Sequence, residues 1–308
     1  MTEKNTSRVS SAWLHNELKA AGAIELEGQA ADDAVRDAGM ILFDATYFLT
    51  DKTRDPKAEY LEERLPGAGF FDITTIADTD SEWPNTVPTA EAFEEAVREL
   101  GCNRDVHVIA YDRLGLFSAA RVWWLFRYFG HNTVSVLDGG LVKWKADQLP
   151  MARGPVSFPR GDFKASPKSS LLHTAEQVHA VIQTDNTETQ IVDARGAGRF
   201  AGNSPEPRQG LRSGHIPGSL NLPYDRLLNE DKTFKSDAEI RAILDDVGID
   251  LQKPVITTCG SGVTACILSL AFERLGAGDS AVFDGSWTEW GTREELPVST
   301  LSVSAEKS

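Results

Sequence analysis

Hydrophobic residues along the chain form short β-branched runs that alternate with longer stretches of helical period. The run at 108–111, Val-Ile-Ala-Tyr, has the length and composition of a buried strand. Before it, Phe93, Val97 and Leu100 lie on one face of a predicted helix that ends at Gly101. Repeated alternation of these two patterns is typical of an α/β fold, in which helices flank a parallel sheet.

The same series of signals occurs twice. In each half an apolar run ends in aspartate, a Pro-Gly turn follows, a predicted helix ends at glycine, and an Asp-Gly pair precedes a tryptophan. Corresponding positions lie 146 to 151 residues apart throughout. The pairs are Asp44 and Asp193, Pro66 and Pro217, Gly101 and Gly248, Asp138 and Asp284, and Trp144 and Trp290. Such a steady offset indicates a duplicated domain.

The length of the chain agrees with a duplication, because 308 residues are about twice the usual size of one domain. We therefore predict two tandem α/β domains, at residues 1–150 and 169–308. The segment 149–168 contains four prolines and two glycines and has no clear period. Residues 151–168 are accordingly predicted to form the linker.

The composition of the chain disfavours several classes of partner and binding site. The chain carries 31 basic and 46 acidic residues, a net charge of −15, which disfavours nucleic acid and anionic membranes as partners. Three cysteines are too few for a disulfide framework or a four-cysteine zinc site. No apolar run has the length of a signal peptide or a transmembrane helix. We expect a cytoplasmic protein.

The most informative position comes eleven residues after the glycine that ends a predicted helix in each half. There the second half has Cys259, followed by Gly260, Ser261, Gly262, Val263 and Thr264 before a predicted helix. Two glycines allow the backbone amides to converge on the sulfur, and the helix start adds positive potential. Both effects favour the nucleophilic thiolate. The first half has Asp112 instead, in a loop one residue longer, and a carboxylate cannot accept a sulfane sulfur, so that half is predicted to be catalytically inactive.

A cysteine before a glycine-rich loop also occurs in cysteine phosphatases. Those enzymes need an arginine six residues after the cysteine to bind phosphate, and this chain has Ala265 there. The loop contains no basic side chain at all, so a phosphatase is not expected.

The duplicated layout, the Gly-His215-Ile-Pro-Gly motif and the Cys-Gly-Ser-Gly-Val-Thr loop resemble the rhodanese superfamily, in particular its branch that uses 3-mercaptopyruvate. Thiosulfate-using members carry basic residues where this chain has Gly260 and Ser261. The resemblance covers the chain from about Val9 to about Trp290. It implies a rhodanese-like domain in each half, an inactive first domain and a persulfide intermediate on Cys259.

The resemblance also implies a binding site for the substrate carboxylate. The family places one arginine in a Gly-Arg-Phe motif and another nine residues later, and this chain has Arg199 and Arg208 at these positions. Guanidinium groups suit a planar 2-oxo-carboxylate because they donate paired, charge-assisted hydrogen bonds. Arg195, two residues after Asp193, is instead expected to be structural and paired with a carboxylate.

One family motif is altered. The first-half motif His-Ile-Pro-Gly-Ala reads Arg64-Leu-Pro-Gly-Ala here, so a relay from Ser261 through that histidine to an aspartate matching Asp55 cannot operate as usually drawn. Ser261 remains a candidate for polarising the substrate, and Arg64 and Asp55 are candidate cleft residues. For His215 we favour a structural role in its turn over that of a general base.

These observations predict a sulfurtransferase. In this mechanism Cys259 takes the sulfur of 3-mercaptopyruvate, pyruvate leaves, and the persulfide passes its outer sulfur to cyanide or to a thiol acceptor such as thioredoxin or a small thiol. Such a mechanism is expected to need no metal and no organic cofactor. A thiosulfate sulfurtransferase is the alternative on the same scaffold, and a non-catalytic rhodanese-like binding module is the third hypothesis.

Overall fold

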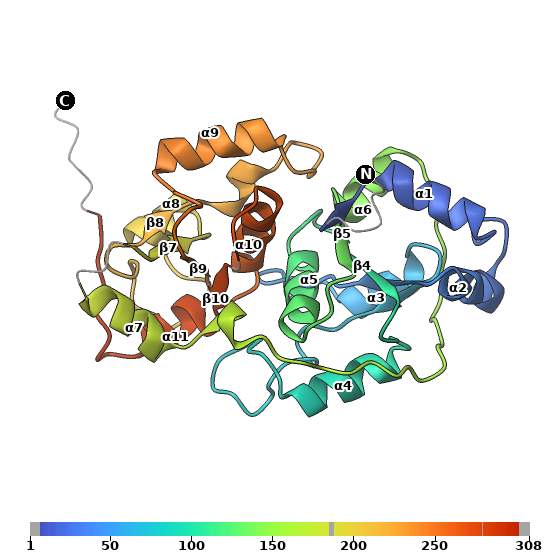
Figure 1. Ribbon diagram of the computed structural model, residues 1–308, viewed down its shortest axis with the longest axis horizontal. Helices are drawn as coiled ribbons and strands as arrows, with labels where there is room; N and C mark the ends of the chain where they lie inside the picture. Colours follow the sequence, from blue (N-terminus) through green and yellow to red (C-terminus); the bar gives the residue numbers. More distant parts are fainter. Residues whose placement is uncertain (1–6, 185–187, 279, 302–308) are drawn as a thin grey trace. The chain divides into compact units, whose positions relative to one another are not determined.

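The computed structural model describes residues 7–184, 188–278 and 280–301, which form two compact units (Figure 1). The first unit comprises Met1–Thr79, Val87–Lys168 and Leu228–Phe234. The second comprises Asp80–Thr86, Ser169–Leu227 and Lys235–Ser308. Each half of the chain thus contributes one short segment to the unit formed mainly by the other half, a feature absent from the predicted domain boundaries.

The first unit contains a five-stranded parallel sheet in the order β1-β5-β4-β2-β3. Its strands are β1 (Arg8–Val9), β2 (Met40–Asp44), β3 (Ala68–Phe70), β4 (His107–Tyr111) and β5 (Val134–Leu137). Its helices are α1 (Ser11–Ala20), α2 (Gly28–Asp37), α3 (Pro56–Glu62), α4 (Ala90–Glu99), α5 (Ala119–Tyr128) and α6 (Gly140–Ala146).

The second unit repeats this topology, with a parallel sheet in the order β6-β10-β9-β7-β8. Its strands are β6 (Leu172–His173), β7 (Gln190–Asp193), β8 (Leu220–Asn221), β9 (Val255–Thr258) and β10 (Ala281–Phe283). Its helices are α7 (Ala175–Gln183), α8 (Ala197–Ala201), α9 (Asp237–Val247), α10 (Ala265–Arg274) and α11 (Ser286–Thr292), with short 3-10 turns η2 (Ser169–Leu171) and η3 (Tyr224–Leu227). The predicted fold class is confirmed in both halves.

The apolar strands are continuous because both faces of each sheet are covered. In β2, Leu42 packs in a core that includes residues of α1, α2 and α6. The next residue, Phe43, points to the other face and stacks on Phe126 of α5, with ring centroids 6.2 Å apart. Alternation of this kind buries every residue of the strand and leaves its carboxyl end as the place for chemistry.

The segment predicted as a linker packs along the first unit. Ala152 forms an antiparallel bridge with Arg64, and the amide of Gly161 donates to the carbonyl of Arg98 at 2.8 Å. Phe163 is 1% exposed and lies edge-on to Phe93. Residues 153–168 form neither a helix nor a strand, and this explains why the segment shows no regular hydrophobic period.

No helix in the described part of the chain combines the length and the apolar character needed to cross a membrane.

Candidate active site

Cys259 follows β9, the central strand of the second sheet, and is 2% exposed. The chain then forms a short loop up to Thr264, the N-cap residue of α10. Gly262 has a φ of +72°, which a residue with a side chain rarely adopts, while Val263 is buried. The loop thereby turns sharply enough to bring successive amides around one point beside the sulfur.

The first turn of α11 fixes the loop. The amide of Trp287 donates to the carbonyl of Cys259 at 2.9 Å. The amide and the hydroxyl of Thr288 donate to the carbonyl of Gly260 at 2.9 and 2.6 Å. Because carbonyl and amide point in opposite directions across a trans peptide, these bonds turn the amides of Gly260 and Ser261 away from α11.

Ser286 provides a third attachment. Its hydroxyl oxygen accepts hydrogen bonds from the amides of Cys259 and Gly262 at 3.2 and 3.1 Å, and it donates to the carbonyl of Phe283 at 2.7 Å. Ser286 is fully buried, so this hydroxyl replaces water as the partner of both amides.

Other amides of the loop remain open. Within the described ranges, no protein acceptor binds the amides of Ser261, Thr264 or Ala265, and the hydroxyl of Ser261 makes no hydrogen bond. These donors lie at the start of α10, where the helix dipole adds positive potential. The arrangement is suited to a negatively charged group on or beside the sulfur of Cys259.

Arg199 of α8 borders the loop. A Cβ atom on Gly260 would lie 3.1 Å from its Nη2 atom, so the guanidinium is close to the loop backbone. Its Nε donates to the carboxylate of Glu206 at 3.0 Å, and Nη2 donates to the same oxygen. The side chain of Glu206 is 2% exposed and that of Arg199 is 23% exposed, so a buried carboxylate orients an arginine that still reaches solvent.

Arg208 has a single, longer hydrogen bond within the described chain, to Thr288 at the start of α11. Its Nη1 donates to the hydroxyl of Thr288 at 3.4 Å, and no carboxylate in the described part of the chain lies within ion-pair distance of it. Arg195, in contrast, binds both Asp193 and Glu206 and is buried. The predicted structural pairing of Arg195 is confirmed.

In the first unit, a carboxylate occupies the centre of the corresponding loop. Asp112 is fully buried, and its side chain accepts hydrogen bonds from the amides of Leu114, Ser118 and Ala119 at 2.8, 2.8 and 2.9 Å. The corresponding amides of the second loop belong to Ser261, Thr264 and Ala265, the three that have no partner there. The first unit therefore shows that a loop of this shape binds a carboxyl group through these three amides.

A model of the rhodanese-like domain matches residues 29–147 and 174–293. This chain belongs to the rhodanese family. It is 39% identical to human 3-mercaptopyruvate sulfurtransferase, over 92% of each chain. It is 45% identical to thiosulfate sulfurtransferase of Cricetulus griseus, over 82% of this chain and 85% of the other. The crystal structure of SseA from Escherichia coli, described as a 3-mercaptopyruvate sulfotransferase, is 36% identical and superposes with a TM-score of 0.78, over 92% of this chain and 99% of that one.

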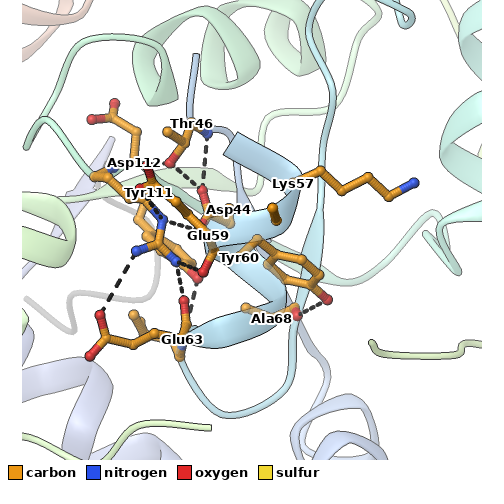
Figure 2. A network of polar contacts seen from close by, with 12 residues as sticks. Asp44, Thr46, Lys57, Glu59, Tyr60, Glu63, Ala68, Tyr111 and Asp112 are labelled. Atoms are coloured by element: carbon orange, nitrogen blue, oxygen red, sulfur yellow. Dashed lines mark hydrogen bonds and ion pairs between the residues drawn. The ribbon is translucent and has the colours of Figure 1, made fainter. Parts of the chain in front are cut away.

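The first unit of this rhodanese-family protein uses its loop for internal contacts. Arg113, at the position of Gly260, donates through Nη2 to the carbonyls of Glu59 and Glu63. Its amide donates to the hydroxyl of Thr46 at 3.1 Å, and Thr46 in turn binds the carboxylate of Asp44 (Figure 2). Burial raises the pKa of Asp44 to about 6, against the opposing effects of the Thr46 hydrogen bond and the Arg113 charge. A polar network thus occupies the end of this sheet.

Arg64 and Asp55 also serve the first unit internally. Arg64 is 1% exposed, binds the carboxylate of Asp32 through both Nη atoms at 3.1 Å, and donates to the carbonyl of Gly154. Its charge is therefore neutralised by the buried carboxylate of Asp32. Asp55 is the exposed N-cap of α3 and accepts from the amides of Lys57 and Ala58, which accounts for its presence without a relay.

The surroundings of His215 agree with the predicted structural role. Its side chain, however, contacts Phe200 and not a residue of its own turn. It is 5% exposed, its Nδ1 lies 2.8 Å from the carbonyl of Phe200, and its ring stacks on that of Phe200 at 3.9 Å. Its backbone forms an antiparallel bridge with Ser299, as Arg64 does with Ala152 in the first unit.

Sequence reasoning missed Glu206, Ser286 and Thr288. The Asp-Gly pair before Trp290 was noticed only as a sign of the repeat, yet the two copies differ at the next position, where Gly140 corresponds to Ser286. That difference was the available signal. Within the described residues, no group of three or more His, Cys, Asp or Glu side chains is placed to bind a metal ion.

Proposed function

We propose that this protein is a 3-mercaptopyruvate sulfurtransferase in which Cys259 carries the sulfur. The observation that carries the proposal is the correspondence between the two loops. Amides that bind the Asp112 carboxylate in the first unit have open counterparts around Cys259. The full-length similarity to human 3-mercaptopyruvate sulfurtransferase supports the choice of donor.

The reaction has two steps. The thiolate of Cys259 attacks the donor sulfur, an S–S bond forms, and the C–S bond breaks with its electron pair passing to the enolate of pyruvate, which then takes up a proton. An acceptor thiolate next attacks the outer sulfur, giving an acceptor persulfide and regenerating the Cys259 thiolate. The open amides of Ser261, Thr264 and Ala265 stabilise the attacking thiolate of Cys259 before the first step and the negative charge that returns to the Cys259 sulfur in the second step.

The two arginines bind the donor carboxylate. Arg208 has no carboxylate partner among the described residues, and Arg199 is oriented toward the loop by Glu206. Their forked donors match a carboxylate and hold the donor sulfur near Cys259. The hydroxyl of Ser261 is free of protein partners in the described chain and donates to the donor carbonyl.

The acceptor is a thiol such as thioredoxin or a small thiol, or cyanide. Cys102, Cys259 and Cys266 form no disulfide, which agrees with a reducing cytoplasm as the place of action.

Thiosulfate is the second candidate donor, because a relative 45% identical to this chain is a thiosulfate sulfurtransferase. Gly260 and Ser261 add no charge to the loop, whereas Arg199 supplies one positive charge beside it. We therefore expect weaker turnover with thiosulfate than with 3-mercaptopyruvate.

A paired turnover assay tests the proposal. Wild type, Cys259→Ser and the control Cys102→Ala are each given 3-mercaptopyruvate or thiosulfate with excess thiol. The expected result is a preference for 3-mercaptopyruvate in wild type and in Cys102→Ala, and no turnover in Cys259→Ser. A preference for thiosulfate would overturn the donor assignment, and full activity of Cys259→Ser would overturn the mechanism.

A further inference from the structure

The two hydroxyl residues at the start of α11, Ser286 and Thr288, distinguish the second loop from the first. At the corresponding positions of α6 the first unit has Gly140 and Val142, which have no hydroxyl. One contact is common to both units: the amide of Leu141 donates to the carbonyl of Asp112 at 3.0 Å, as that of Trp287 does to Cys259. The hydroxyl contacts occur only beside the cysteine.

Ser286 is held in an unfavourable backbone conformation. Its φ is +50°, in the left-handed region that side-chain-bearing residues rarely adopt. Gly140 has nearly the same φ, +51°, so the turn itself demands this conformation and glycine is the residue that suits it. A serine retained there indicates a use for its side chain.

That use follows from the side chain at the end of the strand. In the first unit the carboxylate of Asp112 is an internal acceptor that holds the loop amides in place. A cysteine is a weak hydrogen-bond acceptor and must stay available for reaction. The hydroxyl of Ser286 is instead the internal acceptor of the second loop: it binds the buried amides of Cys259 and Gly262 and leaves the amides that correspond to those bound by Asp112 open.

Thr288 acts on the next peptide group and on the donor-binding arginine. Its hydroxyl donates to the carbonyl of Gly260 and accepts from Arg208. Since the carbonyl of Gly260 and the amide of Ser261 belong to one peptide plane, holding the carbonyl aims the amide. A single hydroxyl therefore connects the loop to the residue expected to bind the donor carboxylate.

We propose that Ser286 and Thr288 are positioning residues: Ser286 fixes the loop in its catalytic shape, and Thr288 couples that shape to Arg208 and so to donor binding. This inference rests on the proposed function for its kinetic consequences, but its structural part concerns the loop alone.

The test replaces each hydroxyl residue by its first-unit counterpart. In Ser286→Gly and Ser286→Ala we expect kcat with 3-mercaptopyruvate to fall about tenfold or more, with KM changed by less than about threefold, because donor-binding arginines remain. In Thr288→Val we expect KM to rise about threefold or more, with a smaller effect on kcat. Thr292→Val is the control. It removes a hydroxyl from the same helix, and among the described residues that hydroxyl binds only the carbonyl of Thr288. We expect this variant to keep the wild-type kcat and KM.

Comparison of the two Ser286 variants separates positioning from stability. Glycine relieves the left-handed strain and alanine does not, so Ser286→Gly should unfold at the higher temperature. If the residue were merely structural, activity would follow stability. Equal loss of kcat in both variants supports the proposal, and wild-type kcat in either variant overturns it. An unchanged KM in Thr288→Val overturns the role of Thr288.

Amide hydrogen exchange tests the loop without any donor. Ser286→Gly and Ser286→Ala should increase the exchange rates of the amides of Cys259 and Gly262, while Thr292→Val should leave them unchanged. Wild-type exchange rates in both Ser286 variants would overturn the proposal. If the wild-type protein turns over neither donor, the proposed function fails, and the exchange measurement still decides whether Ser286 holds the loop.

Discussion

The carboxylate of Glu206 binds the guanidinium of Arg199 through Nε and Nη2 and so aims it at the backbone of Gly260. The same carboxylate also binds Arg195, which is buried. One buried acidic residue thus compensates a structural arginine and orients an arginine beside the candidate active site.

Glu206→Gln should therefore affect both stability and donor binding. Loss of the negative charge leaves buried Arg195 with Asp193 as its acidic partner and costs up to about 3 kcal/mol of unfolding free energy. Arg199 loses its oriented partner, so KM for 3-mercaptopyruvate should rise about threefold or more, with a smaller change in kcat. Denaturant unfolding and steady-state kinetics measure the two effects. Unchanged KM would show that Arg199 does not depend on Glu206.

Arg208→Ala should weaken donor binding more selectively. Removal of a charge-assisted hydrogen-bond donor costs about 1.5–3 kcal/mol, which corresponds to an increase in KM of about tenfold or more, while kcat changes little. Arg208→Lys keeps the positive charge but loses the forked guanidinium, so its KM should lie between those of wild type and Arg208→Ala. The control is Arg226→Ala, since Arg226 is part of an exposed ion pair with Asp246. Wild-type KM in Arg208→Ala would remove Arg208 from the carboxylate site.

Asp112→Ala should destabilise the first unit, because two buried amides and one partly buried amide lose their acceptor. We expect a loss of about 2–4 kcal/mol. Acetate should raise the unfolding temperature of Asp112→Ala more than that of wild type, since it can occupy the vacated anion site; sodium chloride at equal ionic strength is the control. Equal responses of the two proteins to acetate would contradict an anion-binding loop.

Arg64→Ala should lower the unfolding free energy by about 3–5 kcal/mol, because it leaves Asp32 as an uncompensated buried charge. Asp32→Asn combined with Arg64→Met removes both charges and should recover much of this loss. Chemical unfolding of wild type and of these two variants measures the effect. A loss in the double variant as large as that in Arg64→Ala would argue against a coupled pair.

Asp44→Asn should change how stability depends on pH. Burial raises the pKa of Asp44 from 3.8 to about 6, so ionisation is more costly in the folded protein than in the unfolded one. As pH rises from about 4 to about 6, this group lowers the unfolding free energy by up to about 3 kcal/mol, and the cost is constant at higher pH. Between about pH 4 and about pH 6, the unfolding free energy of Asp44→Asn should therefore rise relative to that of wild type. Parallel pH profiles would contradict the raised pKa.

The duplication, the alternation of strands and helices, and the position of Cys259 at the end of a strand all follow from the amino-acid sequence. These features are local, because a run such as 255–258 and a terminator such as Gly248 express their preferences over a few residues. The repeat then supplied a second copy against which each motif could be compared, and this comparison identified Asp112 as the counterpart of the cysteine.

Tertiary structure alone decided which polar groups meet. From the sequence, Arg64 is an altered motif residue, and only the approach of Asp32, 32 residues earlier in the chain, shows that its charge is used internally. Ser286 looked like part of a repeated turn, and only the packing of α11 against the loop reveals that its hydroxyl binds the amides of Cys259 and Gly262. The reason is physical: local propensities act between neighbours in the chain, whereas hydrogen bonds and ion pairs depend on three-dimensional distances that are set when distant elements pack.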